Sequence, residues 1–279
     1  MVDIRYSQNL YTNNSTLQRL ISNSGINADD IVLDIGAGRG IITEELSKYA
    51  KKVIAYELDD RYYEELKLKF DKYPNVLLRK EDFLNTGLPK EKFKIFSNIP
   101  FAITSDIVNK IADINSELQE AFLFVQKESA ERYLGIPKGT QISTILSFMY
   151  EVSISEELYR EDFRPIPSVD VVLLSMKSKG LDSGDYELYR DFVTYIFNQM
   201  NGSVLDTFKK LFTFNQLKYI REYLKKNNYS KPTGIPSDYY IDIFQRFKTN
   251  GDRYIRIVKG YYVKHLDIHS KMEKVHRSR

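Results

Sequence analysis

Short apolar runs alternate with stretches of helical spacing along the first 126 residues. Apolar or β-branched residues fill segments short enough for buried strands, at 31–35, 53–57, 76–83, 93–96 and 121–125. Between them, apolar residues recur at every third or fourth position, which predicts helices. Strands that alternate with helices are typical of an α/β fold with a parallel, doubly wound sheet. Two further strands are expected at 152–158 and 169–176.

The pattern changes near residue 179. A polar linker at 180–184 precedes four segments with helical spacing, and a polar tail is expected from Tyr254 onward. The four helical segments are 186–200, 204–212, 215–226 and 237–247. The sequence therefore predicts two domains, residues 1–178 with the sheet and residues 179–279 with helices.

A glycine-rich turn follows the first strand. Gly36, Gly38 and Gly40 are spaced G-x-G-x-G, and glycine allows both a tight turn and a close backbone approach to a ligand. The dinucleotide fingerprint, G-x-G-x-x-G, would have its third glycine where this chain has Ile41. The spacing disfavours a pyrophosphate cradle, and with it a nicotinamide-dependent dehydrogenase. It favours a ligand without phosphates.

Carboxylates follow the second and third predicted strands. Glu57, at the end of its strand, is placed to accept hydrogen bonds from both hydroxyls of a ribose, and the alternative is a Glu exposed on the surface. After the third strand, Asp82 can accept a hydrogen bond from an adenine amine, and Phe83 can pack on the ring. The spacing allows Glu81 the same role as Asp82.

The fourth strand opens into Asn98-Ile99-Pro100-Phe101. The Asn98 side-chain oxygen and a nearby backbone carbonyl could accept hydrogen bonds from an amino group on an aromatic base, which would localise the nitrogen lone pair. Pro100 lacks an N–H and biases Ile99 toward an extended conformation. Phe101 offers a flat face on which a flipped-out base could stack. The alternative is a strand–turn–helix corner with a buried Phe.

These groups should meet in one crevice. Right-handed crossovers place the carboxyl ends of all parallel strands on the same side of a sheet, and ligands of open α/β sheets bind there. The crevice would join the glycine turn, Glu57, Asp82 and Asn98. A coincidence of all four groups is much less expected by chance than any one of them.

Composition narrows the class of protein. The chain of 279 residues contains no Cys, which excludes disulfides, thiolate nucleophiles and cysteine-based zinc sites. His265, His269 and His276 lack acidic neighbours at ligand spacing, so no metal site is expected. The N-terminus lacks the apolar segment of a signal peptide and no 18-residue apolar run occurs, so we expect a cytoplasmic protein without a membrane span.

The net charge of +3 is unevenly distributed. Residues 1–177 carry 22 Lys and Arg against 27 Asp and Glu, a net charge of −5, whereas residues 178–279 carry 19 against 11, a net charge of +8. A basic C-terminal third on an acidic body suggests a polyanionic partner such as RNA. The alternative is a solvated helical domain that is rich in Lys.

With these features, residues 5–177 resemble the Erm family of rRNA adenine dimethyltransferases and their close relatives that dimethylate small-subunit rRNA. The C-terminal third is similar only in being basic and helical. The matching segments are Ser7-Gln8-Asn9-Leu10, Asp34-Ile35-Gly36-Ala37-Gly38-Arg39-Gly40, Glu57, Glu81-Asp82, Ser97-Asn98-Ile99-Pro100-Phe101, Ser105-Asp106-Ile107-Val108 and Phe163-Arg164-Pro165-Ile166-Pro167-Ser168-Val169.

The resemblance implies a Rossmann-like methyltransferase sheet with S-adenosylmethionine as the cofactor. The cofactor contacts that it implies are Asn9, Tyr11, Gly36, Gly38, Glu57, Asp82 and Asn98. The catalytic stretch would be Asn98, Ile99, Pro100 and Phe101, in which Asn98 orients the target amine and Phe101 stacks on the adenine. Many relatives have Tyr where this chain has Phe101, so the stacking face is kept and the hydroxyl is lost.

The resemblance also implies a function. The protein would be a monomer that methylates the 6-amino group of one adenine in large-subunit rRNA, which would give resistance to macrolide, lincosamide and streptogramin B drugs. Ile99 in the second position of the tetrapeptide looks more like Erm proteins, whereas small-subunit relatives more often have Leu there. Two alternatives remain open: a small-subunit dimethyltransferase of ribosome assembly, and an RNA-binding assembly factor with a vestigial site.

Overall fold

The computed structural model describes residues 9–181, 183–199 and 202–267. Contacts divide the chain into two compact units. The first, which we call the sheet unit, comprises Met1–Ala130 and Tyr150–Gly180. The second, which we call the helical unit, comprises Glu131–Met149 and Leu181–Arg279. Ser7 and Gln8 of the predicted N-terminal motif lie outside the described residues, as do His269 and His276.

The sheet unit alternates strands and helices, as the hydrophobic pattern predicts. In chain order its elements are β1 (Leu10–Tyr11), α1 (Asn14–Asn23), β2 (Ile31–Ile35), α2 (Ile41–Leu46), β3 (Lys52–Tyr56), α3 (Asp60–Lys69), β4 (Val76–Arg79), the short 3₁₀ helix η2 (Phe83–Asn85), β5 (Phe93–Asn98), η3 (Phe101–Ile103), α4 (Thr104–Ile111), β6 (Leu118–Gln126), β7 (Tyr150–Leu158), η4 (Arg160–Asp162), β8 (Phe163–Arg164) and β9 (Val171–Ser178). Helix α5 (Lys127–Leu134) follows β6.

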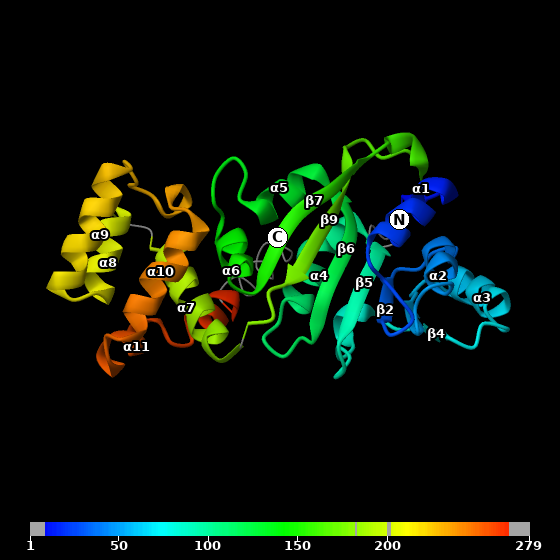
Figure 1. The fold of residues 1–279 in the computed structure, drawn as a ribbon, viewed down its shortest axis with the longest axis horizontal. Coiled ribbons are helices and arrows are strands. Elements are labelled where there is room, and N and C mark those ends of the chain that lie inside the picture. Colours follow the sequence, from blue (N-terminus) through cyan, green and yellow to red (C-terminus); the bar gives the residue numbers. More distant parts are fainter. Residues whose placement is uncertain (1–8, 182, 200–201, 268–279) are drawn as a thin grey trace, which may run out of the picture. The chain divides into compact units, whose positions relative to one another are not determined.

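Seven strands form one sheet in the order β4-β3-β2-β5-β6-β9-β7 (Figure 1). The pairs from β4 to β6 are parallel, which confirms the predicted α/β sheet. Strand β9 runs antiparallel to both of its neighbours, β6 and β7. A separate two-stranded ribbon pairs β1 with β8.

The core of the sheet unit follows the alternation of side chains along each strand. Val32, Phe96 and Phe124 face a cluster to which α1 contributes Leu17 and Ile21, and α2 contributes further apolar residues. Asn13 caps α1, because its side chain accepts a hydrogen bond from the Thr16 N–H. Helices α1 and α2 therefore cover one face of the sheet, next to the carboxyl ends of its strands.

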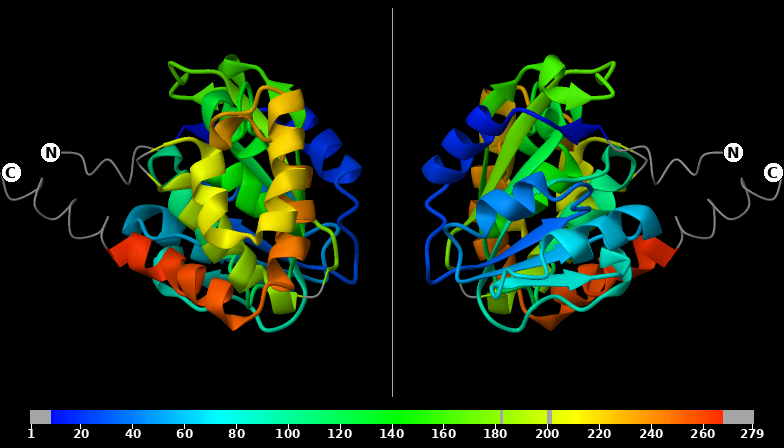
Figure 2. Two further views of the ribbon diagram at one scale, coloured as in Figure 1. Left: turned by 90° about the vertical axis from the view of Figure 1, so that its left-hand side faces the viewer. Right: turned by 90° about the vertical axis from the view of Figure 1, so that its right-hand side faces the viewer.

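The helical unit contains α6 (Gln141–Met149), the turn η5 (Ser183–Asp185), α7 (Tyr186–Phe197), α8 (Val204–Leu211), α9 (Phe214–Lys226), the turn η6 (Pro232–Gly234), α10 (Ser237–Lys248) and α11 (Asp252–Val258). Helices α8 and α9 lie side by side (Figure 2). Ser203 and Thr213 begin them with reciprocal capping boxes. An aromatic core built on Phe192, Phe244 and Phe247 holds the unit together.

The division of the chain differs from the predicted boundary at residue 178 in one segment. Residues 131–149 group with the helical unit, because α6 packs against α7. Phe148 stacks on Tyr189 with ring centroids 4.5 Å apart, and the Tyr189 hydroxyl donates to the Thr144 carbonyl. The hydrophobic pattern predicts that 141–150 is helical but contains no information about its partner.

The segment after Tyr254, predicted as a polar tail, is helical as far as it is described. Helix α11 spans Asp252–Val258, and residues 261–267 are helical too. Asp191, buried in α7, fixes this segment: its carboxylate oxygens accept hydrogen bonds from the backbone N–H groups of Gly260 and Tyr262. The hydrophobic pattern does not predict this helical segment, because the Asp191 carboxylate holds its backbone and few apolar residues are needed.

Within residues 9–181, 183–199 and 202–267, no helix is both long and apolar enough to cross a membrane. Over the same part of the chain, no group of three or more acidic or His side chains is arranged to hold a metal ion.

Candidate active site

The carboxyl ends of neighbouring parallel strands carry the predicted site residues. Gly36 follows β2, Glu57 follows β3, Asp82 lies in the turn after β4, and Asn98 is the last residue of β5. Two clefts open here, and Gly36 lines both of them. The first cleft is lined by Leu10, Tyr11, Asp34, Gly36, Ala37, Arg39, Ile41, Ile42 and Asn98. The second cleft is lined by Ile35, Gly36, Tyr56, Glu57, Leu58, Glu81, Asp82, Phe83, Leu84, Pro100 and Ile103.

The glycine turn has the backbone conformation that its sequence predicts. Gly36 and Gly38 adopt φ angles of +75° and +54°, a region that residues with a Cβ rarely enter. At Gly40, a Cβ would lie 2.5 Å from Leu66 of the neighbouring helix α3 and 2.7 Å from Phe70, which caps the end of that helix. The turn therefore packs closely against α3 at Gly40, while Gly36 at its start lines both clefts.

Glu57 is buried, which rules out the alternative of a surface side chain. One carboxylate oxygen, Oε2, accepts a hydrogen bond of 2.7 Å from the Gly38 N–H. The other, Oε1, accepts from the N–H groups of Leu58 and Asp59, each at 2.8 Å. The carboxylate therefore fixes the glycine turn as well as lining the second cleft, a structural role that the sequence does not reveal.

Both acids after β4 line the second cleft, so the choice between Glu81 and Asp82 stays open on position alone. Their surroundings differ. Asp82 is held in place, because Oδ1 accepts from the Leu84 N–H and Oδ2 accepts from the Asn85 side chain. Glu81 is half-exposed and lies 3.6 Å from the Arg79 guanidinium. The ring of Phe83 is buried against Tyr56, with centroids 5.3 Å apart.

Lys110 of α4 fastens the turn that carries Asp82. Its ammonium donates hydrogen bonds to the carbonyls of Phe83, Leu84 and Thr86, and lies 4.9 Å from the centre of the Phe83 ring. Burial lowers the pKa of Lys110. A single side chain thus links the helix after the Asn98 strand to one wall of the second cleft. Nothing in the local sequence distinguishes Lys110 from other helix lysines.

Asn98 lines the first cleft and is oriented by the N-terminal arm. Its side-chain N–H donates a hydrogen bond of 2.7 Å to the backbone carbonyl of Asn9. The side-chain oxygen, Oδ1, accepts no hydrogen bond from any described residue. Asn98 is thus held by one end of its amide and retains its acceptor, as the predicted role requires.

The remaining predicted site residues differ in whether they line a cleft or are buried in the core. Tyr11 lines the first cleft, but its ring is buried against Phe124 and Phe163, and burial together with the nearby Asp162 carboxylate raises its pKa. Pro100 lines the second cleft. Ile99 is only 2% exposed and lines neither cleft.

Phe101 begins the turn η3 and is half-buried, with one side against the core cluster of the sheet unit. The strand–turn–helix corner is thus present, and Phe101 is only partly buried within it. Gly38 lines neither cleft, and its N–H is already bound to Glu57.

The sequence pattern assigned no role to Asp34, although this residue lies deep in the first cleft. It is 1% exposed; Oδ2 accepts a hydrogen bond of 2.6 Å from Thr43, whereas Oδ1 is buried without a partner. Burial raises the pKa of Asp34 to about 7, although the hydrogen bond from Thr43 counteracts part of this effect. The sequence did contain an indication of this site residue, because Asp34 is an acidic residue inside the otherwise apolar strand 31–35.

Sheet order, glycine turn and the acid after the second strand together define a Rossmann-like methyltransferase with added C-terminal helices. The crystal structure of 23S rRNA methyltransferase ErmE shares this fold, with a TM-score of 0.76 at 23% identity over 86% of this chain and 100% of that chain. That of a dimethyladenosine transferase from Plasmodium falciparum gives a TM-score of 0.65 at 26% identity over 94% and 98%.

Residues 2–249 match the family described as ribosomal RNA adenine dimethylase, and the chain belongs to that family. Over 183 residues it is 40% identical to ribosomal RNA small subunit methyltransferase A of Thermotoga petrophila, covering 64% of this chain and 69% of that protein. Over 227 residues it is 31% identical to an rRNA adenine N-6-methyltransferase of Bacillus licheniformis, covering 79% and 78%.

The protein is accordingly an S-adenosylmethionine-dependent rRNA adenine N6-methyltransferase. This confirms the predicted enzyme class, cofactor and kind of substrate, and it excludes the dehydrogenase. Its relatives carry the names of both branches of the family, small-subunit methyltransferase A and rRNA adenine N-6-methyltransferase.

The position of Lys110 leads to a testable expectation for cofactor affinity. Replacement of Lys110 by Met keeps the aliphatic stem but removes three hydrogen bonds to the turn that carries Asp82. We expect the Kd for S-adenosylmethionine to rise about tenfold, equivalent to roughly 1.4 kcal/mol, as measured by isothermal titration calorimetry. Lys67→Met removes an exposed lysine on α3 and should leave the Kd unchanged. Equal affinities of K110M and the wild type would disprove the role of this lysine.

Proposed function

We propose that this enzyme methylates the 6-amino group of one adenine in large-subunit rRNA and thereby confers resistance to macrolide, lincosamide and streptogramin B antibiotics. Support comes from relatives named rRNA adenine N-6-methyltransferase, which match about four fifths of both chains, and from Ile99 in the catalytic tetrapeptide. Because the substrate is rRNA, the reaction would take place in the cytoplasm.

A second candidate is methylation of small-subunit rRNA during ribosome assembly. Higher identity favours it: three Thermotoga proteins named ribosomal RNA small subunit methyltransferase A are 38–40% identical to this chain over 183–185 residues. The site would be the same in both cases. The two candidates differ only in the RNA that is presented to it.

We propose that the two clefts together hold S-adenosylmethionine. Asp34 leaves a buried, unpartnered carboxylate oxygen in the first cleft, and an ammonium group such as that of the methionine part would satisfy it. The second cleft combines the buried ring of Phe83 with the carboxylates of Glu57 and Asp82, which fits an adenine and the hydroxyls of a ribose. When bound, the cofactor supplies an electrophilic methyl group.

The single observation that carries the proposed chemistry is the amide of Asn98 at the first cleft. Its amide nitrogen donates to the Asn9 carbonyl, which fixes the amide, so Oδ1 would accept a hydrogen bond from an incoming amine. Accepting such a hydrogen bond localises the amine lone pair and positions it for direct displacement. No strong base is needed, because the proton can leave after the nitrogen has become cationic. Phe101 would stack on the flipped adenine.

We also propose that the helical unit binds RNA through one face of α9, which we call the α9 stripe. Phe214, Lys218, Arg221 and Lys225 are spaced four, three and four residues apart, so they share one side of the helix. All four are exposed, and Phe214 is 83% exposed. A row of cations ending in an exposed ring fits a phosphate backbone with one unstacked base. The two tyrosines of this helix are not part of the stripe, since Tyr219 lies against the Arg246 guanidinium and Tyr223 stacks on Tyr239.

Neutralising the stripe should weaken the salt dependence of RNA binding. In the variant K218Q/R221Q/K225Q, three phosphate contacts are removed, so the slope of log Kd against log salt concentration should fall by about 2 for single-stranded RNA. The control K51Q/K67Q/K72Q removes equal charge from exposed positions of the sheet unit. Filter binding of an rRNA fragment between 50 and 300 mM salt measures both. The same slope in both variants would contradict the assignment.

The test of function is methyl incorporation from labelled S-adenosylmethionine into protein-free large-subunit and small-subunit rRNA, with the modified nucleotide mapped by reverse transcription. We expect methylated adenine in the drug-binding region of large-subunit RNA, together with reduced macrolide susceptibility of cells that express the enzyme. Label confined to small-subunit RNA would establish the second candidate instead. Label in neither RNA would refute both candidates.

A further inference from the structure

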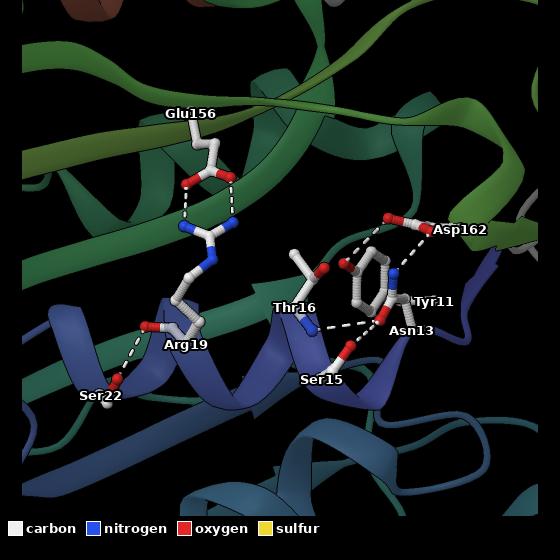
Figure 3. A network of polar contacts seen from close by, with 8 residues as sticks. All are labelled: Tyr11, Asn13, Ser15, Thr16, Arg19, Ser22, Glu156 and Asp162. Atoms are coloured by element: carbon white, nitrogen blue, oxygen red, sulfur yellow. Dashed lines mark hydrogen bonds and ion pairs between the residues drawn. The ribbon is translucent and has the colours of Figure 1, made fainter.

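The N-terminal arm is anchored by one residue far away in sequence. Asp162 lies at the end of η4, immediately before β8. Its carboxylate accepts hydrogen bonds from the Asn13 side chain at 2.9 Å and from the Tyr11 hydroxyl at 3.4 Å (Figure 3). Its backbone carbonyl accepts two more, from the N–H and the hydroxyl of Thr12, at 2.7 and 2.8 Å. A single residue therefore binds three consecutive residues of the arm.

The anchored arm reaches the catalytic amide within two residues. Leu10 and Tyr11 pair with β8 in register and line the first cleft. Asn9, the next residue toward the N-terminus, presents the carbonyl that receives the Asn98 side-chain N–H. The arm contributes no other described hydrogen bond to Asn98. The orientation of the Asn98 amide thus depends on where the arm lies, and the arm is held by Asp162.

We propose that Asp162 is a positioning residue for methyl transfer: through Tyr11, Thr12 and Asn13 it holds the Asn9 carbonyl against Asn98, so that the Asn98 oxygen faces the target amine. The inference rests on the proposed function of Asn98. It assigns a role to a carboxylate that lies outside both clefts. Asp162 itself would touch neither the cofactor nor the RNA.

A neighbouring ion pair provides an internal control. Arg19 of α1 forms a two-pronged ion pair with Glu156 of β7, on the same side of the sheet unit (Figure 3). It ties α1 to the sheet without involving residues 9–13. Loss of this pair should loosen α1 and leave the arm in place.

The test swaps the amide and the carboxylate of the Asn13–Asp162 hydrogen bond between the two positions. Asn13→Asp keeps a side-chain oxygen to cap the Thr16 N–H, but it places two carboxylates at hydrogen-bonding distance. In the double variant N13D/D162N, the new amide can donate to the new carboxylate, which restores the bond in reverse. Glu156→Gln is the matched acid-to-amide control.

Two readouts are measured for each variant: hydrogen–deuterium exchange of residues 9–13, and kcat and KM for methylation of rRNA. We expect N13D to speed exchange of the arm and lower kcat about tenfold, with both returning to within about threefold of the wild type in N13D/D162N. E156Q should change neither. Recovery in the double variant is the signature that loss of helix capping or of general stability would not produce.

The outcomes separate this proposal from the function on which it rests. Unchanged exchange of the arm in N13D would refute the anchor, whatever the activity. Faster exchange with an unchanged kcat would refute the link from the arm to Asn98. A wild-type enzyme that methylates no rRNA would instead overturn the proposed function, while the exchange data would still show whether Asp162 holds the arm.

Discussion

Replacement of Asn98 by Ala should lower kcat for methyl transfer by about 10²–10³-fold, the usual cost of removing one precisely placed polar group from a reacting centre. The variant loses the acceptor that would localise the lone pair of the target amine. Binding of S-adenosylmethionine should weaken far less, because Asn98 is only one of the nine residues that line the first cleft. Single-turnover methylation of rRNA, together with calorimetric titration of the cofactor, measures the two effects separately.

The control for this substitution is Asn75→Ala. The Asn75 side chain also donates to backbone carbonyls, those of Ser47 and Ala50, but it lies outside both clefts. At about 1 kcal/mol per hydrogen bond lost, it should cost at least as much stability as N98A, because it loses two hydrogen bonds instead of one, without affecting turnover. Methylation by N98A at the wild-type rate would disprove the assignment of Asn98 to the reacting centre.

The strands and their polar ends could be predicted from sequence because each depends on local information. Apolar runs define β2, β3 and β5, and a rule of chain topology then brings Gly36, Glu57 and Asn98 to one edge. The same reasoning places Asp82 in the second cleft. None of these inferences required knowledge of which distant segments touch.

The features that escaped prediction all depend on contacts between distant segments. Lys110 reaches a turn that precedes it by more than 20 residues, and Asp162 binds an arm about 150 residues away. Hydrophobic spacing records burial but not the partner of a buried group. For the same reason, the packing of α6 on α7 could not be read from the spacing of their residues.

Glu57 was predicted in the right place, but the sequence indicated only one of its two roles. Its position after β3 suggested a ligand contact, and the residue does line the second cleft. The same carboxylate also receives three backbone N–H groups and fixes the glycine turn. One side chain can therefore be needed for both the cofactor and the shape of its site, and loss of binding on its mutation does not separate the two.

The buried carboxylate of Asp34 makes stability depend on pH. Burial raises its pKa from 3.8 to about 7, so between these values the folded state without cofactor holds a proton that the unfolded chain has released. Stability that is fully present below pH 3.8 is therefore lost as the pH rises toward 7, and the loss is complete above it. The total is about 4 kcal/mol as an order of magnitude. Asp34→Asn removes this loss, so D34N should resist urea better than the wild type at pH 8 but not at pH 4.

Cofactor binding by D34N should change in the opposite direction. Ionised Asp34 can pair with the ammonium of S-adenosylmethionine, so wild-type affinity should rise between pH 5.5 and 7.5, by up to about tenfold per unit below the pKa. The upper limit is set by the α-amino group, which ordinarily loses its proton near pH 8. D34N should bind about 10–100-fold more weakly at pH 7.5 and show no such rise, because an amide pairs poorly with a cation.

Titration calorimetry across this range tests the pairing, with Glu45→Gln as the control. Glu45 of α2 is also a buried carboxylate, but it is paired with Lys48 and lines neither cleft. Affinity that does not depend on pH in the wild type would show that Asp34 does not face the ammonium. If D34N is more stable without cofactor and yet binds it more weakly, the buried charge of Asp34 serves ligand binding and lowers the stability of the folded state.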